Sequence, residues 1–389
     1  MVTASPNLYE TLGVAKSAKP EALRKAYRKL ARQHHPDVSQ DPKAHDLMSK
    51  INEAFETLID PERRADYDAM LAGRGYAEPA APAETRKPIF VKLKTYLKAH
   101  RTPIYSVAFA PDTGQLISSS FDSEIIWWDT KTDKPARRAR LDTGVVSTLK
   151  PLTKDRLVAA GSVENTVTLW ELENGEVGSW KSAEEAWVSC LAISGDGKAV
   201  ATGSIHKSLA VADSRSGVKL FTRNEHLESV TAVAWSQDGK LLATGSADAT
   251  ARIYTADGEL VREIKRIRSA VTSIAFSPNK QFLAVAAVDL SIRIFNLDTG
   301  QLMKMMFGHT KPIETLAFHP NNWLLASGSR DGTLGLWNCA KGLGNVRLEA
   351  SHRPISCLAF SPDGSKLAAA GQDRLIRLWE ITVKEDSAA

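Results

Sequence analysis

A unit of 42 residues recurs seven times along most of this chain and constrains its fold more than any other feature. In each copy a turn residue lies six positions before the end of a strand-like segment, as Asp331 lies before Trp337. The seven turn positions are 122, 164, 206, 248, 289, 331 and 373, so successive copies are 42 residues apart, with one step of 41. A period of this length, held over seven copies, indicates a repeat architecture.

Each copy has the pattern of four short strands joined by tight turns. Segments such as IYSVAF (104–109) and IETLAF (313–318) end thirteen residues before the turn position, and SPDG-like turns separate strands. Short alternating segments of this kind are typical of half-buried strands. Four strands make one blade of a propeller, and seven blades close a ring that leaves no free sheet edge. We therefore predict an all-β, seven-bladed propeller.

These repeats resemble those of WD-repeat proteins, and the resemblance covers residues 89–383. It implies that two sets of four residues form the structural hydrogen-bonded tetrad of that family. The sets are His100, Ser118, Asp122 and Trp128, and His309, Ser327, Asp331 and Trp337. The resemblance bears on the fold more than on function, because one fold serves many functions.

The last blade lacks a fourth strand at its C-terminal end. Its third strand ends at WEITV (379–383), whereas a strand-like segment, IFVKLKTYLKAH (89–100), precedes the first blade without a partner. We expect residues 89–98 to pair with the last blade and close the ring. The lysines of this segment would then lie on an outer edge, where they discourage edge-to-edge pairing.

The N-terminal region has the pattern of a helical hairpin. Residues 20–34 place Leu23, Tyr27 and Leu30 at helical spacing, and Pro36 ends the helix. A second helix is expected over about 43–59, which puts the stretch RQHHPDVS (32–39) at the tip between the helices. Five cations lie off the apolar stripe of the first helix: Arg24, Lys25, Arg28, Lys29 and Arg32.

Three segments of this region resemble the J domain of DnaJ-type co-chaperones, in order and in spacing. They are YETLG, AYRKLARQHHPD and INEAFETLIDPERRADYD, and the resemblance spans about residues 7–71. It implies that His35, Pro36 and Asp37 contact a DnaK-type (heat shock protein 70) chaperone and trigger its ATP hydrolysis. The resemblance also implies that the preceding helix docks on an acidic surface, through Arg24, Tyr27, Arg28 and Lys29.

The His-Pro-Asp tripeptide has other interpretations. A catalytic base needs a concave pocket and a nucleophile beside it, which the tip of a hairpin does not offer. Metal binding by His34 and His35 is disfavoured, because adjacent residues rarely face one ion. A plain turn at Asp37, with a solvated cationic face on the helix before it, stays open as a structural alternative.

These patterns predict a multi-domain chain with a small all-α J domain over residues 1–72 and the propeller over residues 89–383. Residues 73–88, GRGYAEPAAPAETRKP, have the composition of a linker, and residues 384–389 form a tail. The DnaJ-type Gly/Phe-rich segment and CxxC repeats are missing from the sequence. We therefore expect recognition of clients or of location to lie in the propeller.

Composition favours a cytoplasmic protein that does not bind nucleic acid. The net charge is only +5, from 50 basic and 45 acidic residues, and much of the excess falls near the linker. The three cysteines, Cys190, Cys339 and Cys357, are too scattered for a disulfide framework, which suits a reducing compartment. Neither a secretory signal nor an apolar stretch of membrane-spanning length is apparent.

The propeller sequence does not indicate an enzyme. Cys190 and Cys357 occupy equivalent strand positions, where small core residues are expected rather than reactive thiols. There is no phosphate-binding loop and no convincing Ser-His-Asp order. We expect no catalytic residues, no metal and no cofactor.

The residue before each turn position should project from the face that the turns share. In five consecutive blades this residue is apolar, and it is polar in the last two. A contiguous apolar patch usually marks an interaction site, although these side chains could also fold back onto neighbouring turns. The candidate partner-binding residues are Phe121, Val163 and Ile205, with Tyr105 and Trp187 from the starts of inner strands.

We therefore expect a co-chaperone whose J domain stimulates a DnaK-type ATPase while the propeller, as an adaptor, holds a client or another protein partner. The alternative is a WD-repeat scaffold that assembles a complex, with the J domain serving only as a docking handle. The two differ in whether function depends on His35.

Overall fold

The structure is a computed structural model of the 389-residue chain. It describes residues 7–34, residues 51–68 except 53, 56, 62, 63 and 66, and residues 89–383 except 142–144, 154, 164–165, 175, 184–186, 266, 321–322 and 340–345. The chain divides into two units, residues 1–80 and 81–389, which we call the head and the propeller. The boundaries expected at residues 72 and 88, and the expected tail, lie outside the described residues.

Helix α1 (Leu8–Leu12) of the head is fixed by local signals at both ends. The Asn7 side chain accepts a hydrogen bond from the backbone N–H of Glu10, and the Glu10 carboxylate accepts one from the backbone N–H of Asn7. This reciprocal pair satisfies two donors that the first helical turn leaves free. Gly13 ends the helix at φ 63°, a left-handed conformation that glycine adopts without a steric penalty.

Helix α2 (Pro20–His34) packs its apolar stripe into the core of the head. Residues 51–52, 54–55 and 57–59 are also helical, whereas residues 43–50 of the expected second helix lie outside the described part. The small all-α head expected from the sequence is confirmed. Its core consists of Tyr9, Leu12, Leu23, Ile51, Ala54, Leu58 and Tyr67.

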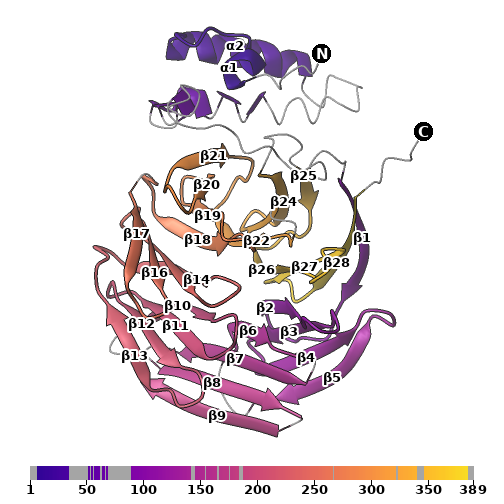
Figure 1. Ribbon diagram of the computed structural model, residues 1–389. Helices are drawn as coiled ribbons and strands as arrows, with labels where there is room; N and C mark the ends of the chain where they lie inside the picture. Colours follow the sequence, from indigo (N-terminus) through magenta and orange to yellow (C-terminus); the bar gives the residue numbers. More distant parts are fainter. Residues whose placement is uncertain are drawn as a thin grey trace, which may run out of the picture. The chain divides into compact units, whose positions relative to one another are not determined.

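The propeller consists of seven four-stranded antiparallel sheets arranged around a central axis, as Figure 1 shows. The seven-bladed architecture predicted from the repeat is confirmed. Each of blades 1 to 6 uses four consecutive strands, with the first strand innermost. Blades 1 to 3 consist of β2 (Ile104–Phe109), β3 (Leu116–Ser120), β4 (Glu124–Asp129) and β5 (Lys134–Arg140); β6 (Thr148–Pro151), β7 (Arg156–Val163), β8 (Thr166–Glu173) and β9 (Glu176–Ala183); and β10 (Val188–Ile193), β11 (Ala199–Ser204), β12 (Leu209–Asp213) and β13 (Lys219–Arg223).

Blades 4 to 7 continue the same order around the ring. They consist of β14 (Val230–Trp235), β15 (Leu241–Ser246), β16 (Ala251–Thr255) and β17 (Leu260–Ile264); β18 (Val271–Phe276), β19 (Phe282–Ala287), β20 (Ile292–Asn296) and β21 (Leu302–Met306); β22 (Ile313–Phe318), β23 (Leu324–Ser329), β24 (Thr333–Asn338) and β25 (Val346–Glu349); and β26 (Ile355–Phe360), β27 (Lys366–Gly371), β28 (Ile376–Val383) and β1 (Ile89–Leu97).

Strand β1 supplies the outer strand of blade 7, so the two ends of the propeller sequence pair with each other (Figure 1). The pairing with β28 is antiparallel and runs from Ile89 opposite Val383 to Leu97 opposite Ile376, with an irregularity between Leu93 and Thr95. The ring is thus closed by hydrogen bonds between segments that are far apart in the sequence.

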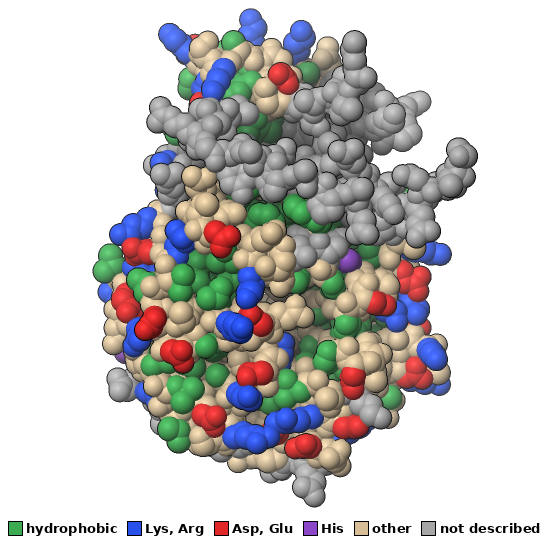
Figure 2. Space-filling model, in the orientation of Figure 1, with side chains coloured by type: hydrophobic (Ala, Val, Ile, Leu, Met, Phe, Trp, Pro, Cys, Tyr) green, Lys and Arg blue, Asp and Glu red, His purple; other side chains and the backbone are tan. Residues whose placement is uncertain are grey.

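The core of the propeller lies between neighbouring blades. Where blades 7 and 1 meet, Leu97, Ile104, Trp128 and Ile376 pack in one buried cluster. In the view of Figure 2, Lys and Arg side chains lie among Asp and Glu side chains over the described surface of the propeller. Within the described parts of both units, no helix is long and apolar enough to cross a bilayer.

Candidate interaction sites

The polar face of α2 is a cluster of exposed positive charge. Its five cations are exposed, while Leu23 on the opposite side of the helix is fully buried. Like charges four residues apart, such as Arg24 and Arg28, repel each other on a helix. In the part of the chain that the structure describes, none of these five side chains forms an ion pair. This face can therefore attract an acidic partner.

Tyr27 of α2 is half-buried and helps to hold the head together. Its ring stacks on Phe55, with centroids 4.2 Å apart and planes 16° apart, and its hydroxyl donates to Asn52 Oδ1 at 3.0 Å. Both contacts join α2 to helical residues of the stretch 51–55. Of the docking residues implied by the resemblance, Arg24, Arg28 and Lys29 are free to meet a partner, whereas Tyr27 also has this structural role.

The tripeptide His35-Pro36-Asp37 lies outside the described residues. Helix α2 ends at His34, so the tripeptide follows directly after the cationic helix. Its role in contacting a chaperone stays a prediction.

The two expected tetrads are hydrogen-bonded networks in the structure. In blade 1, His100 Nε2 lies 2.8 Å from Ser118 Oγ, and His100 Nδ1 lies 3.2 Å from Asp122 Oδ2. The indole N–H of Trp128 donates to Ser118 Oγ at 2.8 Å. Blade 6 repeats this arrangement with distances of 2.7, 3.2 and 2.7 Å, through His309, Ser327, Asp331 and Trp337. The networks tie the turn face of each blade to its buried strands.

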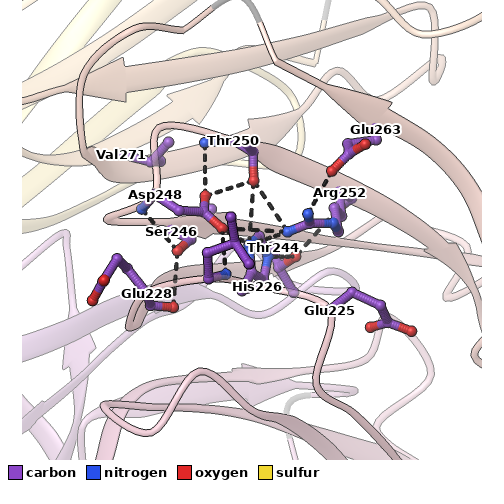
Figure 3. Close-up of polar contacts among 12 residues, drawn as sticks. Glu225, His226, Glu228, Thr244, Ser246, Asp248, Thr250, Arg252, Glu263 and Val271 are labelled. Carbon is purple, nitrogen blue, oxygen red and sulfur yellow. Dashed lines mark hydrogen bonds and ion pairs between the residues drawn. The ribbon is translucent and has the colours of Figure 1, made fainter.

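Blade 4 contains a variant of this network, shown in Figure 3. His226 Nε2 lies 2.7 Å from Thr244 Oγ1, and His226 Nδ1 lies 3.0 Å from Asp248 Oδ2. Arg252 enters the network from β16 and contacts both His226 and Glu263. Burial lowers the pKa of His226, an effect that Asp248 opposes and the Arg252 charge reinforces, so the ring is held neutral.

In blade 5 an arginine takes over the role of the histidine, and in blade 7 an arginine shares that role with Ser351, which fills the histidine position and donates to Asp373 at 2.7 Å. The histidine position holds Ile267 in blade 5, and Arg293 Nη2 donates to Asp289 at 2.7 Å. In blade 7, Arg377 Nη2 lies 2.6 Å from Asp373 Oδ2. Sequence reasoning missed these pairs, although a signal was present. Arg252, Arg293 and Arg377 each stand four residues after the turn aspartate, between two apolar residues of a strand.

Of the three free cysteines, Cys357 is buried, whereas Cys190 and Cys339 are half-buried. Burial raises the pKa of Cys190 and of Cys357 to about 12, so almost no thiolate is present near neutral pH. Among the described residues there is also no group of three His, Cys, Asp or Glu side chains that could hold a metal ion.

The apolar side chains expected on the turn face are exposed and do not fold back onto the turns. Phe121 and Trp187 are 55% and 57% exposed, and Val163, Ile205 and Tyr105 are also exposed. The rings of Tyr105 and Phe121 are 6.4 Å apart. Whether this surface binds a partner stays a prediction.

Sequence reasoning missed one residue of this surface. Leu227 of blade 4 is 71% exposed, more than any other large apolar side chain among the described residues. It directly follows His226, and its backbone N–H donates to Asp248 Oδ2 at 2.9 Å, which fixes it at the turn. Its position after a tetrad histidine is the signal that could have identified it. We call Tyr105, Phe121, Val163, Trp187, Ile205, Leu227 and Val288 the apolar arc.

Comparisons with known proteins match both units of the chain. Residues 7–68 match the family model of the DnaJ domain. Five segments match that of the WD domain, G-beta repeat: 91–129, 217–255, 258–296, 300–338 and 346–380. Residues 130–216, which carry most of blades 2 and 3, fall outside these segments.

The curated relatives are similar to the head. "Chaperone protein DnaJ 1" of Aquifex aeolicus (strain VF5) is 50% identical over 72 residues, 18% of this chain and 20% of that protein. "Chaperone protein DnaJ" of Carboxydothermus hydrogenoformans is 61% identical over 61 residues, 15% of this chain and 16% of that protein. The chain thus spans a fifth or less of the length of these two relatives.

Proposed function

Because the chain joins an N-terminal J domain to a seven-bladed WD-repeat propeller, we propose that it is a co-chaperone that stimulates ATP hydrolysis by a DnaK-type chaperone. The observation that carries this proposal is the exposed cationic face of α2. The helix ends at His34, and the His-Pro-Asp tripeptide follows directly in the sequence. The active site belongs to the chaperone. The chain itself supplies contacts and carries no catalytic residues.

The head has two tasks in this proposal. Arg24, Arg28 and Lys29 bring the head to an acidic surface of the chaperone, since opposite charges speed encounter and orient the partners. His35, Pro36 and Asp37 then make the specific contact that accelerates hydrolysis. Tyr27 keeps α2 in place through Phe55 and Asn52.

The propeller is the adaptor in this proposal. The apolar arc gives it an exposed surface of the kind that binds other proteins. The linker between the two units raises the local concentration of the J domain near whatever the propeller holds. The three free cysteines are consistent with a reducing compartment, and action in the cytoplasm is part of the proposal.

Steady-state ATP hydrolysis by a DnaK-type chaperone tests the proposal. The wild-type chain should raise the rate, and His35→Gln and Asp37→Asn should abolish most of that rise. Lys16→Glu, an exposed position outside α2, serves as a control variant and should behave as wild type. A wild-type chain that does not stimulate any of several DnaK-type chaperones would favour the scaffold alternative.

A further inference from the structure

The turn face of the propeller has two sectors of different chemistry. We define this face as the side that carries the seven turn positions and the loops before the inner strands. The apolar arc occupies it over blades 1 to 5. Exposed cations concentrate over blades 6 and 7 and the start of blade 1, whereas Lys207 and Arg268 are single exposed cations over blades 3 and 5. We call the concentrated group the basic sector: Arg101, Lys311, Arg330, Arg353 and Arg374.

The fold assembles the basic sector from distant parts of the sequence. Arg374 Nη1 donates to the backbone carbonyl of Arg101 at 3.3 Å, across 273 residues of sequence. Arg353 is held in the next loop, where its backbone N–H donates to Ser351 Oγ at 3.0 Å. These contacts use backbone groups of Arg101 and Arg353, so both guanidinium groups can bind a ligand.

The nearby carboxylates leave this sector with an excess of positive charge. Glu314 is paired with Arg330. Two turn aspartates also form ion pairs. Asp373 Oδ2 lies 2.6 Å from Arg377 Nη2, and Asp331 Oδ2 lies 3.7 Å from Arg347 Nη2. These acids are thus matched by cations outside the cluster of Arg101, Arg353 and Arg374. Asp122 accepts a hydrogen bond from the Arg101 backbone N–H at 3.0 Å, but its side chain is mostly buried beside His100. Within the described residues, no carboxylate forms an ion pair with the guanidinium groups of Arg101, Arg353 or Arg374.

The basic sector adjoins the aromatic end of the apolar arc. Arg101 precedes Pro103 by two residues, and the Pro103 carbonyl accepts a hydrogen bond from the Phe121 backbone N–H at 3.2 Å. Phe121 and Tyr105 present their rings beside each other in the same blade. A ligand that lies across blades 7 and 1 would therefore meet guanidinium groups first and then two aromatic rings.

We propose that the turn face binds a partner polypeptide whose acidic residues lie on Arg101, Arg353 and Arg374 and whose adjacent bulky apolar side chain packs on Tyr105 and Phe121. This proposal rests on the adaptor function proposed above and gives the partner a chemistry. Arginine pairs with carboxylates through two parallel hydrogen bonds, which fixes orientation as well as adding affinity. The apolar contact supplies affinity through the area that it removes from water.

The chemistry of this face favours a polypeptide over a nucleic acid. A nucleic acid carries a regular row of phosphates and binds best to an extended row of cations. Here the basic sector gives way to the apolar arc, and blade 4 places the exposed acids Glu225 and Glu228 on either side of its loop. These carboxylates would repel a phosphate backbone that continued around the face.

The test is a selection of binders from a phage-displayed library of random twelve-residue peptides on the full-length chain. Enriched peptides should contain two or more Asp or Glu residues next to Phe, Trp, Leu or Ile. Their dissociation constants are then measured by fluorescence anisotropy with fluorescein-labelled synthetic copies. The double variant Arg101→Glu/Arg374→Glu and the single variant Phe121→Ser should each weaken binding about tenfold or more.

A matched control separates the site from general charge effects. Lys198→Glu/Lys240→Glu makes the same charge change in turns at the opposite ends of the strands, and should leave the dissociation constants unchanged. Circular dichroism confirms that each variant is folded. Three results would overturn the proposal: enriched peptides that contain no acidic residues, dissociation constants that are unchanged by Arg101→Glu/Arg374→Glu, or no enrichment at all.

Single-stranded DNA tests the other class of partner. The proposal fails if a labelled twenty-nucleotide oligothymidine binds more tightly than the enriched peptides and if its dissociation constant is unchanged by Phe121→Ser. The face would then be a polyanion site. These measurements need neither chaperone nor ATP. Failure of the co-chaperone function would appear only in the ATPase assay, so the two failures are distinguishable.

Discussion

Asp289 and Arg293 face each other across the turn of blade 5, with Arg293 Nη2 2.7 Å from Asp289 Oδ2. Arg293 is almost fully buried, and no histidine is available, because Ile267 fills that position. Burial by itself would raise the pKa of Asp289, but the hydrogen bonds and charge of Arg293 lower it overall. In blade 5 this arginine–aspartate ion pair therefore stands in place of the histidine–aspartate hydrogen bond of blades 1 and 6.

Removing one partner of this buried pair should be costly. Arg293→Leu removes the buried cation that donates to Asp289 and should lower the free energy of unfolding by about 3 kcal/mol. The double variant Asp289→Asn/Arg293→Leu removes both charges and should lower the free energy of unfolding by less than Arg293→Leu does. Urea unfolding followed by circular dichroism measures both, with the exposed Arg215→Leu as control. An Arg293→Leu protein as stable as the control would contradict this account.

The buried histidines predict how the stability of the propeller depends on pH. Burial lowers the pKa of His100 and of His226 below the ordinary 6.5, although Asp122 and Asp248 oppose the shift. Below about pH 6.5 the unfolded chain then binds more protons than the folded one, so stability is lost as the pH falls. The thermal unfolding midpoint should drop by roughly a few degrees between pH 7 and pH 5.

The double variant His100→Asn/His226→Asn provides the comparison for this pH dependence. It should be less stable at pH 7 but should lose less stability on acidification, because two of the groups responsible are gone. A wild-type midpoint that is higher at pH 5 than at pH 7 would show that these rings are not held neutral in the fold.

The strand that closes the ring should carry a large share of its stability. Leu97 of β1 is fully buried with Ile104, Trp128 and Ile376, whereas Lys92 of the same strand is exposed. Leu97→Ala should cost about 2–5 kcal/mol, the range for deleting a buried leucine side chain. Lys92→Ala should cost almost nothing. Equal unfolding midpoints for the two variants would mean that the contact between blades 7 and 1 contributes little.

Charge reversal on α2 should weaken the encounter with the chaperone. Arg28→Glu removes an exposed cation from the centre of the cluster and should raise the concentration needed for half-maximal ATPase stimulation about tenfold at low salt. The difference from wild type should shrink as salt screens the charges. The matched Lys16→Glu control should follow wild type throughout. A salt-independent effect of Arg28→Glu would point to a structural defect of the helix instead.

The repeat pattern was sufficient to predict the seven blades, because position 122 and its six equivalents recur with almost constant spacing. The apolar residues before the turns could be predicted to project from the turn face, since their place in the repeat sets their direction. Whether they stay exposed or fold back onto neighbouring turns was decided only by the structure, in which they are exposed. The buried arginines of blades 5 and 7 were not predicted, although their place four residues after the turn aspartate is a signal, because the sequence does not show that a charged strand residue is buried.

The basic sector shows a second limit of the sequence. Arg101 and Arg374 stand at unrelated places in their repeats and 273 residues apart, and only ring closure brings them together. Net charge does not reveal such a cluster, because the chain as a whole is only mildly basic. The structural role of Tyr27 could not be predicted either, because its stacking on Phe55 depends on how two helical segments pack.

Single-turnover ATP hydrolysis tests the central claim most directly. A preformed complex of a DnaK-type chaperone with radiolabelled ATP is mixed with the full-length chain, so that nucleotide exchange does not contribute to the rate. The account predicts a hydrolysis rate constant that rises and saturates with the concentration of the wild-type chain and stays at its basal value with His35→Gln. Equal acceleration by wild type and His35→Gln, or none by either, would contradict the claim that this head triggers the ATPase of its partner.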